Sequence, residues 1–277
     1  MRQSARVTRE YGRVMTGVAD RVTLGEGVGL SWNEITLAQL TATPITETTV
    51  EDNPQQLSDS IFSLTPTVIS VQTIITERTA KRISKNVWAK TGGLAQNAIE
   101  RKKDLDGLAI FDGFTTSQPG AGSTLTSGVI SAASANIRSN TTEPWDGPIA
   151  TVLHGFQRHD LYTELVAGVG TYPIPAGPTA RVFSGQFNLP IAEAAIMRDD
   201  LITIDASADA KGGVFASGKG GALVLCQGRS AWTNVRERPE IGGGATEMFH
   251  RDEYAWGERS AGNWGWEIYS DATAPTS

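Results

Sequence analysis

One long stretch without a single lysine or arginine constrains this 277-residue chain more than any other feature of its sequence. The stretch lies between Arg21 and Arg78 and carries seven carboxylates, and eight basic groups then follow between Arg78 and Lys103. It is too polar to form a globule by itself and too rich in β-branched residues to be simply disordered. We therefore expect an extended arm that lies on a basic surface, and a second copy of the same chain offers such a surface.

Two β-rich runs separated by a polar tip predict that this arm is a long hairpin. The first run spans about residues 28 to 43 and the second about 60 to 80, with Pro44 and Pro54 in the irregular tip between them. If each run has about 20 residues, the hairpin projects roughly 65 Å at about 3.3 Å per residue. A domain of about 100 residues has a radius of gyration of only about 13 Å. The hairpin is therefore too long to fold back on its own domain and needs neighbours.

The N-terminal segment, as far as Arg21, is basic. Its arginines recur mostly every three or four positions, which would place most of them on one helical face; they are Arg2, Arg6, Arg9, Arg13 and Arg21. Two interpretations stay open. The segment is either a solvated terminus or a basic arm that docks on a neighbouring subunit or faces a polyanion.

The clearest helix is predicted from about Val87 to Phe111, ending at Gly113. Its apolar residues recur at spacings of three, four and seven and predict one buried stripe, made of Val87, Leu94, Ala98, Leu105 and Leu108. Because glycine weakens a helix, Gly92 and Gly93 are expected to kink or interrupt the start.

The rest of the chain predicts an α+β fold. In the middle third, residues 127–139 and 158–168 have helical patterns, and residues 148–155 read as a buried strand. The C-terminal part, from Ala222 onward, is β-rich, and a turn with three consecutive glycines, at which positive φ is permitted, separates two of its strands.

Several functional classes find little support in the residues. A net charge of −6 argues against a dedicated nucleic-acid binder, and the single cysteine, Cys226, excludes an internal disulfide. No apolar stretch approaches the roughly 20 residues that a membrane-spanning helix needs. His154 and His159 lack the spacing of a zinc site, so we expect no metal, cofactor or catalytic site.

One motif supports an alternative of another class, a nucleotide-dependent enzyme. Residues 213–221, GVFASGKGG, satisfy the first part of a phosphate-loop pattern, but Gly220 stands where a serine or threonine would hold Mg²⁺. An apolar strand follows, whereas a phosphate loop needs a helix whose N-terminus faces the anion. A hairpin or surface loop is the better interpretation.

The order of these parts resembles the major capsid protein of tailed double-stranded-DNA phages, which has the Hong Kong 97 fold. The segments closest to that family are AIERKKDLDGLAIFDGF and RERPEIGGGATEMFHRDEYAWGE. The resemblance implies an N-terminal arm, an extended β-hairpin loop, a peripheral domain with a long spine helix, and a mixed α/β axial domain. These would occupy residues 1–24; 25–80; 81–123 with 226–259; and 124–225 with 260–277.

The resemblance also implies contacts between copies, in which acidic residues of the loop lie across a basic face of an adjacent subunit. The acidic residues would be Glu34, Glu47, Glu51, Asp52 and Asp59. The basic face would comprise Arg78, Lys81, Arg82, Lys85, Arg101, Lys102 and Lys103. The N-terminal arm would present Arg2, Arg6, Arg9 and Arg13, and a turn near three-fold contacts would comprise Glu240, Gly242, Gly243 and Gly244.

Two departures from the family pattern sharpen this expectation. Some members cross-link their shells through a loop lysine bonded to an asparagine of another subunit; here the first lysine is Lys81, so that chemistry is expected to be absent. The short arginine-rich arm also leaves no room for a fused scaffolding segment, so scaffolding is expected from a separate protein.

The expected function is that of a structural subunit in the virion capsid, assembled in the host cytoplasm into hexamers and pentamers. Its expected partners are copies of itself, a portal, a separate scaffolding protein, a decoration protein and double-stranded DNA bound non-specifically, with no membrane. An encapsulin-like compartment that encloses a cargo protein shares the architecture and remains an alternative.

Overall fold

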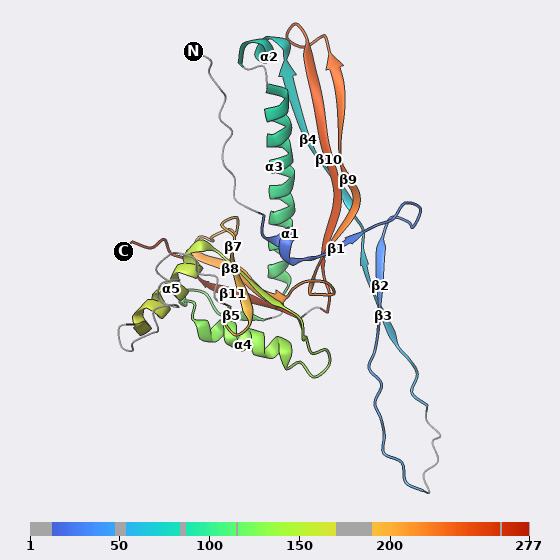
Figure 1. Ribbon diagram of the computed structural model, residues 1–277, viewed down its shortest axis with the longest axis vertical. Coiled ribbons are helices and arrows are strands. Elements are labelled where there is room, and N and C mark those ends of the chain that lie inside the picture. The colour runs from blue at the N-terminus through green and yellow to red at the C-terminus, as the bar shows by residue number, and fades with distance from the viewer. Residues whose placement is uncertain are drawn as a thin grey trace.

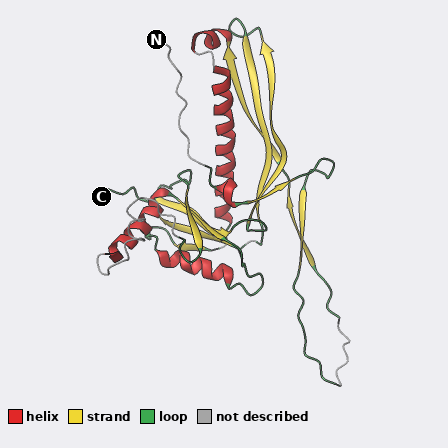
Figure 2. Ribbon diagram, in the orientation of Figure 1, coloured by secondary structure: helices red, strands yellow, loops and turns green. Residues whose placement is uncertain are grey.

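The computed structural model describes residues 13–47, 54–83, 87–114, 116–169, 190–260 and 262–276. They form an elongated lobe, a compact lobe and a hairpin that projects away from both (Figure 1). Helices and strands are mixed in both lobes, as Figure 2 shows, which confirms the predicted α+β class.

The elongated lobe is built on a four-stranded sheet in the order β1-β9-β10-β4. Its strands are β1 (Asp20–Thr23), β4 (Thr67–Thr76), β9 (Leu223–Arg238) and β10 (Ala245–Glu258). β10 lies in the centre and pairs antiparallel with both β9 and β4, whereas β1 runs parallel to β9. Segments far apart in the sequence therefore share one sheet.

Helix α3 (Val87–Leu108) packs against β4 and β10 along the length of this sheet (Figure 1). It is the predicted spine helix, and it continues as the 3₁₀ turn η1 (Ala109–Gly113) to the predicted end. Gly92 and Gly93 do not interrupt it. The short helix α2 (Glu77–Ile83) lies near the start of α3, at the far end of the lobe.

The predicted apolar stripe of α3 is confirmed at Leu108, which is buried, but is wrong at Leu94 and Leu105, which are 42% and 37% exposed. The buried face consists mainly of small and charged residues, namely Ala95, Ile99, Lys103, Asp104, Gly107 and Leu108. Gly107 is in close contact, because a Cβ there would lie 3.0 Å from both Met15 and the Trp256 ring. Small residues thus let the helix approach its neighbours closely.

The compact lobe contains a five-stranded sheet in the order β5-β11-β8-β6-β7. Its strands are β5 (Ser117–Pro119), β6 (Ile149–Leu153), β7 (Ala194–Arg198), β8 (Asp209–Ala216) and β11 (Gly265–Asp271). Helices α4 (Ser127–Arg138) and α5 (Gly155–Val169) lie beside this sheet (Figure 1). Every residue of β6 is buried, which confirms the strand predicted there, and both predicted helices are present.

One hydrophobic core joins the two lobes. It contains Met15 and Val18 of α1 (Met15–Val18), Phe111 of η1, Phe215 of β8 and Leu223 of β9. In the described part of the chain no helix is long and apolar enough to cross a membrane.

The projecting hairpin is formed by β2 (Trp32–Leu37) and β3 (Asp59–Leu64), which pair antiparallel. Its pairing is shorter than predicted, since residues 38–47 and 54–58 continue toward the tip without strand structure (Figure 1). The second predicted run is divided after Leu64, and its latter part is β4, which pairs with β10 rather than with the hairpin. Pro66 lies at this division and has no N–H to donate to a continuous ladder. The expected loop boundary at residue 80 therefore lies beyond the hairpin itself.

Candidate interaction surfaces

The hairpin and its approach expose an unusual number of large apolar side chains. Eight of them are at least 56% exposed: Val28, Leu30, Ile35, Leu37, Leu40, Ile45, Leu57 and Ile61. Single exposed apolar residues are ordinary on protein surfaces, but a concentration of this kind marks an interaction site. The hairpin has the surface of an element that becomes buried against a partner.

The acidic residues of the hairpin divide into two groups. Glu47 and Asp59 are exposed, whereas Glu34 is already bound within its own chain, with Oε2 2.5 Å from Arg259 Nε. Glu51 and Asp52 lie outside the described residues. Glu34 thus holds the base of the hairpin, which corrects its expected role as a free inter-subunit carboxylate.

Arg259 is the centre of this anchor. Its guanidinium forms an ion pair with Asp20 at 2.7 Å, donates a hydrogen bond to the Gly221 carbonyl at 3.0 Å, and lies 5.7 Å from the centre of the Trp32 ring. A pocket of about 710 Å³ lies beside it, between the hairpin and the Glu258–Ser260 segment. Burial raises the pKa of the Glu258 carboxyl in this pocket. Sequence patterns did not reveal this anchor, because its members come from opposite ends of the chain.

The predicted basic face is divided between two places. Arg78, Lys81 and Arg82 are exposed on α2 at the far end of the elongated lobe. Arg101 and Lys102 are exposed on α3, about 21 Å along the helix from its first residue at about 1.5 Å per residue. Lys85 lies outside the described residues. Two separate basic patches therefore replace the single face expected from sequence.

Lys103 does not belong to either patch. Its side chain is 8% exposed, its Nζ is 2.6 Å from a carboxylate oxygen of Asp252, and it lies 5.3 Å from the centre of the Tyr254 ring. Helical periodicity places Lys103 on the face of α3 that is turned toward β10, where it pairs with the Asp252 carboxylate and lies near the Tyr254 ring. It is a buried structural contact between α3 and β10.

The three-glycine turn lies at the same end of the molecule as α2. Gly242, Gly243 and Gly244 have φ values of 56°, 79° and 110°, a region that glycine enters at little cost. The Gly244 carbonyl accepts a 2.9 Å hydrogen bond from the Glu77 N–H at the start of α2. Glu240 forms an ion pair with Arg238 at 3.1 Å. The turn and the α2 basic patch thus make one composite tip.

The N-terminal arm is described only from Arg13 onward, so Arg2, Arg6 and Arg9 lie outside the described residues. Arg13 is 3.3 Å from Glu100 of α3, and the Met15 N–H donates to Asp104 of α3 at 2.9 Å. The described end of the arm is therefore attached to the spine helix of its own chain.

The glycine-rich segment at residues 217–221 is a turn between β8 and β9, as the better of the two interpretations predicted. The Gly220 N–H donates to the Asp20 carboxylate at 3.0 Å. This N–H is therefore bound to a carboxylate of the same chain, and a strand follows rather than a helix. This arrangement does not favour a nucleotide site.

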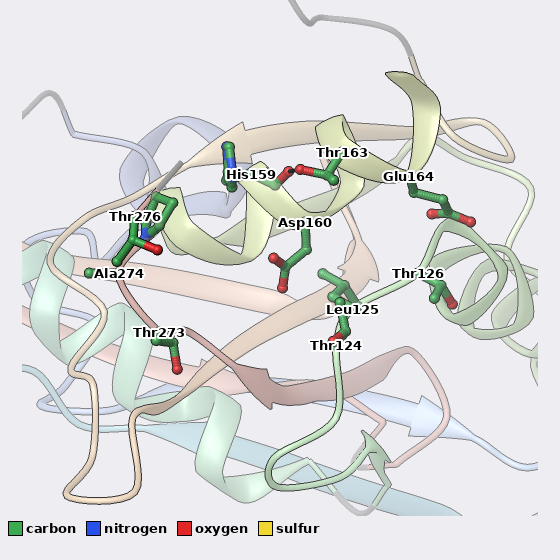
Figure 3. Close-up of a pocket in the computed structure, with 11 residues that line it drawn as sticks. Thr124, Leu125, Thr126, His159, Asp160, Thr163, Glu164, Thr273, Ala274 and Thr276 are labelled. Carbon is green, nitrogen blue, oxygen red and sulfur yellow. Dashed lines mark hydrogen bonds between the residues drawn. The ribbon is translucent and has the colours of Figure 1, made fainter. Parts of the chain in front are cut away.

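A second pocket, of about 510 Å³, lies between α5, residues 124–126 and residues 273–276 (Figure 3). Its polar wall includes His159, Asp160 and several threonines, and burial raises the pKa of the Asp160 carboxyl. The Glu164 carboxylate accepts hydrogen bonds from the backbone and side chain of Ser127 at the start of α4. Within the described ranges, no three His, Cys, Asp or Glu residues are placed to hold a metal ion.

Comparison with known proteins identifies the fold. No family model and no curated protein sequence matches the chain. Among solved structures, the capsid of cyanophage P-SCSP1u matches with a TM-score of 0.74 at 9% identity, covering 98% of this chain and 91% of the other. The head of Helicobacter pylori bacteriophage KHP40 gives 0.74 at 10% identity, with 97% and 94% covered. Mycobacterium phage Che8 gives 0.72 at 12% identity, with 99% and 97% covered. The chain has the Hong Kong 97-like fold of phage capsid structures.

Proposed function

We propose that this chain is the major capsid protein of a tailed double-stranded-DNA phage, self-assembling into the hexamers and pentamers of an icosahedral shell. The observation that carries the proposal is the projecting hairpin, whose large apolar side chains lie in solvent in the isolated subunit. Phage capsid structures match this fold over nearly the whole chain. A second copy of the chain is therefore the partner that would bury the apolar side chains of the hairpin.

Apolar burial supplies the affinity in this mechanism. Fully burying one Leu or Ile side chain contributes about 1.5–3 kcal/mol, whereas an exposed ion pair contributes about 0–1 kcal/mol. The exposed Glu47 and Asp59 therefore set the register and direction of docking. Their complement on the neighbour is the composite tip, whose α2 helix carries Arg78, Lys81 and Arg82.

The hairpin binds the neighbouring subunit without forming a covalent bond. No lysine lies anywhere between residues 22 and 77, so the hairpin offers no amine for an isopeptide bond to an asparagine. The first lysine, Lys81, lies on α2 and is paired with Glu77 at 2.9 Å. Shell strength then comes from many weak, reversible contacts repeated by symmetry.

The lobes have different roles in the shell. The elongated lobe serves as the peripheral domain, with its composite tip near three-fold contacts, and the compact lobe serves as the axial domain around five- and six-fold axes. The subunit acts structurally and not as an enzyme. Its further partners are a portal, a separate scaffolding protein, a decoration protein and packaged double-stranded DNA, and it assembles in the host cytoplasm.

Charge reversal at α2 tests the docking mechanism. Arg78→Glu combined with Lys81→Glu and Arg82→Glu should stop assembly while leaving the thermal unfolding of the subunit within a few degrees of wild type, because these side chains are exposed. Assembly is measured by the fraction of protein that sediments as particles.

A matched control reverses the second patch, Arg101→Glu with Lys102→Glu, which lies away from the composite tip. This variant should assemble more efficiently than the α2 variant. Particles of normal yield and size from the α2 triple variant would contradict the mechanism.

The contents of purified particles separate a genome shell from a cargo compartment. The proposal predicts nuclease-protected double-stranded DNA in particles isolated from infected cells. Particles that consistently contain a second protein and no DNA would favour the encapsulin-like alternative.

A further inference from the structure

Two aspartates face each other at the junction of the two lobes. Asp104 lies on α3, and Asp199 follows β7 in the compact lobe; each is 1% exposed. The carboxyl group of Asp199 lies within hydrogen-bonding reach of Asp104. Neither residue takes part in the surfaces proposed above, and both lie beneath the start of the N-terminal arm.

Each carboxyl group uses one oxygen to hold backbone. The Met15 N–H of α1 donates to Asp104 Oδ1 at 2.9 Å, and the Leu201 N–H donates to Asp199 Oδ1 at 3.0 Å. The other oxygens, both Oδ2 atoms, are buried and have no hydrogen-bond donor among the described residues. If both groups were ionised, two unneutralised negative charges would be close together inside the protein, an arrangement that burial makes strongly unfavourable.

The charged groups around the pair are already occupied by other partners. On α3, Glu100 is paired with Arg13 and Lys103 with Asp252. On the turn after β7, Arg198 is paired with Asp200 at 2.5 Å. Arg158, in the first turn of α5, and His154, the residue before α5, both interact electrostatically with Asp200. β10 contributes the uncharged indole of Trp256, which contacts α3 at Gly107. His154 also interacts with Asp199, but burial lowers its pKa and favours the neutral ring. These described neighbours therefore supply no cation to a second carboxylate near neutral pH.

We propose that Asp104 and Asp199 share one proton, and that this proton holds α1, α3 and the turn after β7 together. One Oδ2 then donates to the other, so a single O–H···O⁻ bond satisfies both buried oxygens. When the proton leaves to solvent as a hydronium ion, the bond is replaced by repulsion between two like charges. The junction between the lobes is therefore sensitive to pH.

The shared proton is expected to leave within the physiological pH range. Burial, and secondarily the adjoining Asp104, raises the pKa of Asp199 from its ordinary value of 3.8 to about 7. The folded chain thus keeps a proton that the unfolded chain releases above about pH 4. Its contribution to stability is complete below that pH, falls as pH rises, and is lost above about pH 7.

The pKa of His154 is shifted in the opposite direction. Burial lowers its pKa below the ordinary value of 6.5, so the folded state prefers the neutral ring and this histidine adds stability as pH rises. The direction of the change therefore distinguishes the aspartate pair from the histidine.

Thermal unfolding of the full-length unassembled chain, measured from about pH 5 to about pH 8.5, tests the proposal. The melting temperature of the wild type should fall by several degrees over this range. In Asp199→Asn the amide donates permanently to Asp104, so the fall should be less than half as large, and the variant should melt above the wild type at the upper end. Asp59→Asn, which removes an exposed carboxylate on the hairpin, should keep the wild-type fall.

Infrared titration provides a second readout that needs only a folded wild type. A protonated carboxyl band should persist near neutral pH and disappear as the pH rises through about 7. Other buried carboxyls, such as Asp160 and Glu258, also have raised pKa values, so the band is assigned by its loss in Asp199→Asn or Asp104→Asn. Equal pH dependence in wild type and Asp199→Asn, or a wild type without a carboxyl band that titrates near neutral pH, would overturn the proposal.

Discussion

Arg259 shows how one residue can fix the direction of a long projecting element. Its guanidinium joins Asp20 of β1, Glu34 of β2 and the Gly221 carbonyl, which come from three distant parts of the sequence. The planar fork of arginine suits several acceptors at once, whereas a lysine ammonium does not present the same geometry. The hairpin therefore leaves the body of the subunit at an angle set by this side chain.

Arg259→Ala should lower the free energy of unfolding by about 2 kcal/mol, because it leaves Asp20, whose side chain is 11% exposed, and the partly exposed Glu34 without their cation. Arg259→Lys should recover part of the loss. Urea unfolding of the unassembled chain measures both. The control is Lys81→Ala, which removes an exposed pair on α2 and should change stability by less than about 1 kcal/mol. Equal effects of Arg259→Ala and Lys81→Ala would show that Arg259 is not an anchor.

Among the elements, helix α3 packs very closely against its neighbours and also carries buried charged side chains. Gly107 leaves room for Met15 and Trp256, and Lys103 and Asp104 bind partners on β10 and α1. The helix is positioned by these specific contacts more than by a broad apolar stripe. Leu94 and Leu105 stay partly exposed on it.

Two glycine substitutions in α3 should have opposite effects. At Gly107 an added Cβ would lie 3.0 Å from Met15 Cβ and from the Trp256 ring, so Gly107→Ala should destabilise the subunit by about 1–2 kcal/mol despite its better helix propensity. At Gly92 nothing lies within 4 Å of an added Cβ, and Gly92→Ala should stabilise it by about 0.5–1 kcal/mol. Chemical unfolding measures both, and changes of the same sign would contradict this packing.

The elements were predictable from local patterns to different degrees. The period of α3 and the continuous apolar run of β6 indicated those elements correctly, because both signals lie within a short window. The buried face of α3 could not be predicted, since Lys103 is buried against Asp252 and Asp104 accepts a hydrogen bond from the Met15 N–H, and both partners are distant in the sequence. The division of the second hairpin run at Pro66 was present in the sequence as a proline within a β-rich segment.

At the scale of the whole molecule, one hydrophobic core joins the two lobes, and a smaller cluster around Leu64, Val224 and Cys226 lies at the base of the hairpin. The apolar side chains farther along the hairpin stay exposed in the isolated subunit. The chain enters the elongated lobe three times, through β1, then β4 with α3, and finally β9 with β10. The stretch without lysine or arginine indicated a projecting arm by its length and charge alone. Sequence could not show that the basic residues that follow this stretch form two patches, because α2 and the middle of α3 separate only in three dimensions.

Negative-stain electron microscopy of the purified full-length chain shows whether the subunit assembles into shells. A shell subunit whose hairpin requires neighbours should form closed particles of uniform diameter, with capsomers visible on their surface. A chain that remains a dispersed monomer at every concentration and salt condition tried would contradict the account, because its exposed hairpin would then have no second copy to bury it.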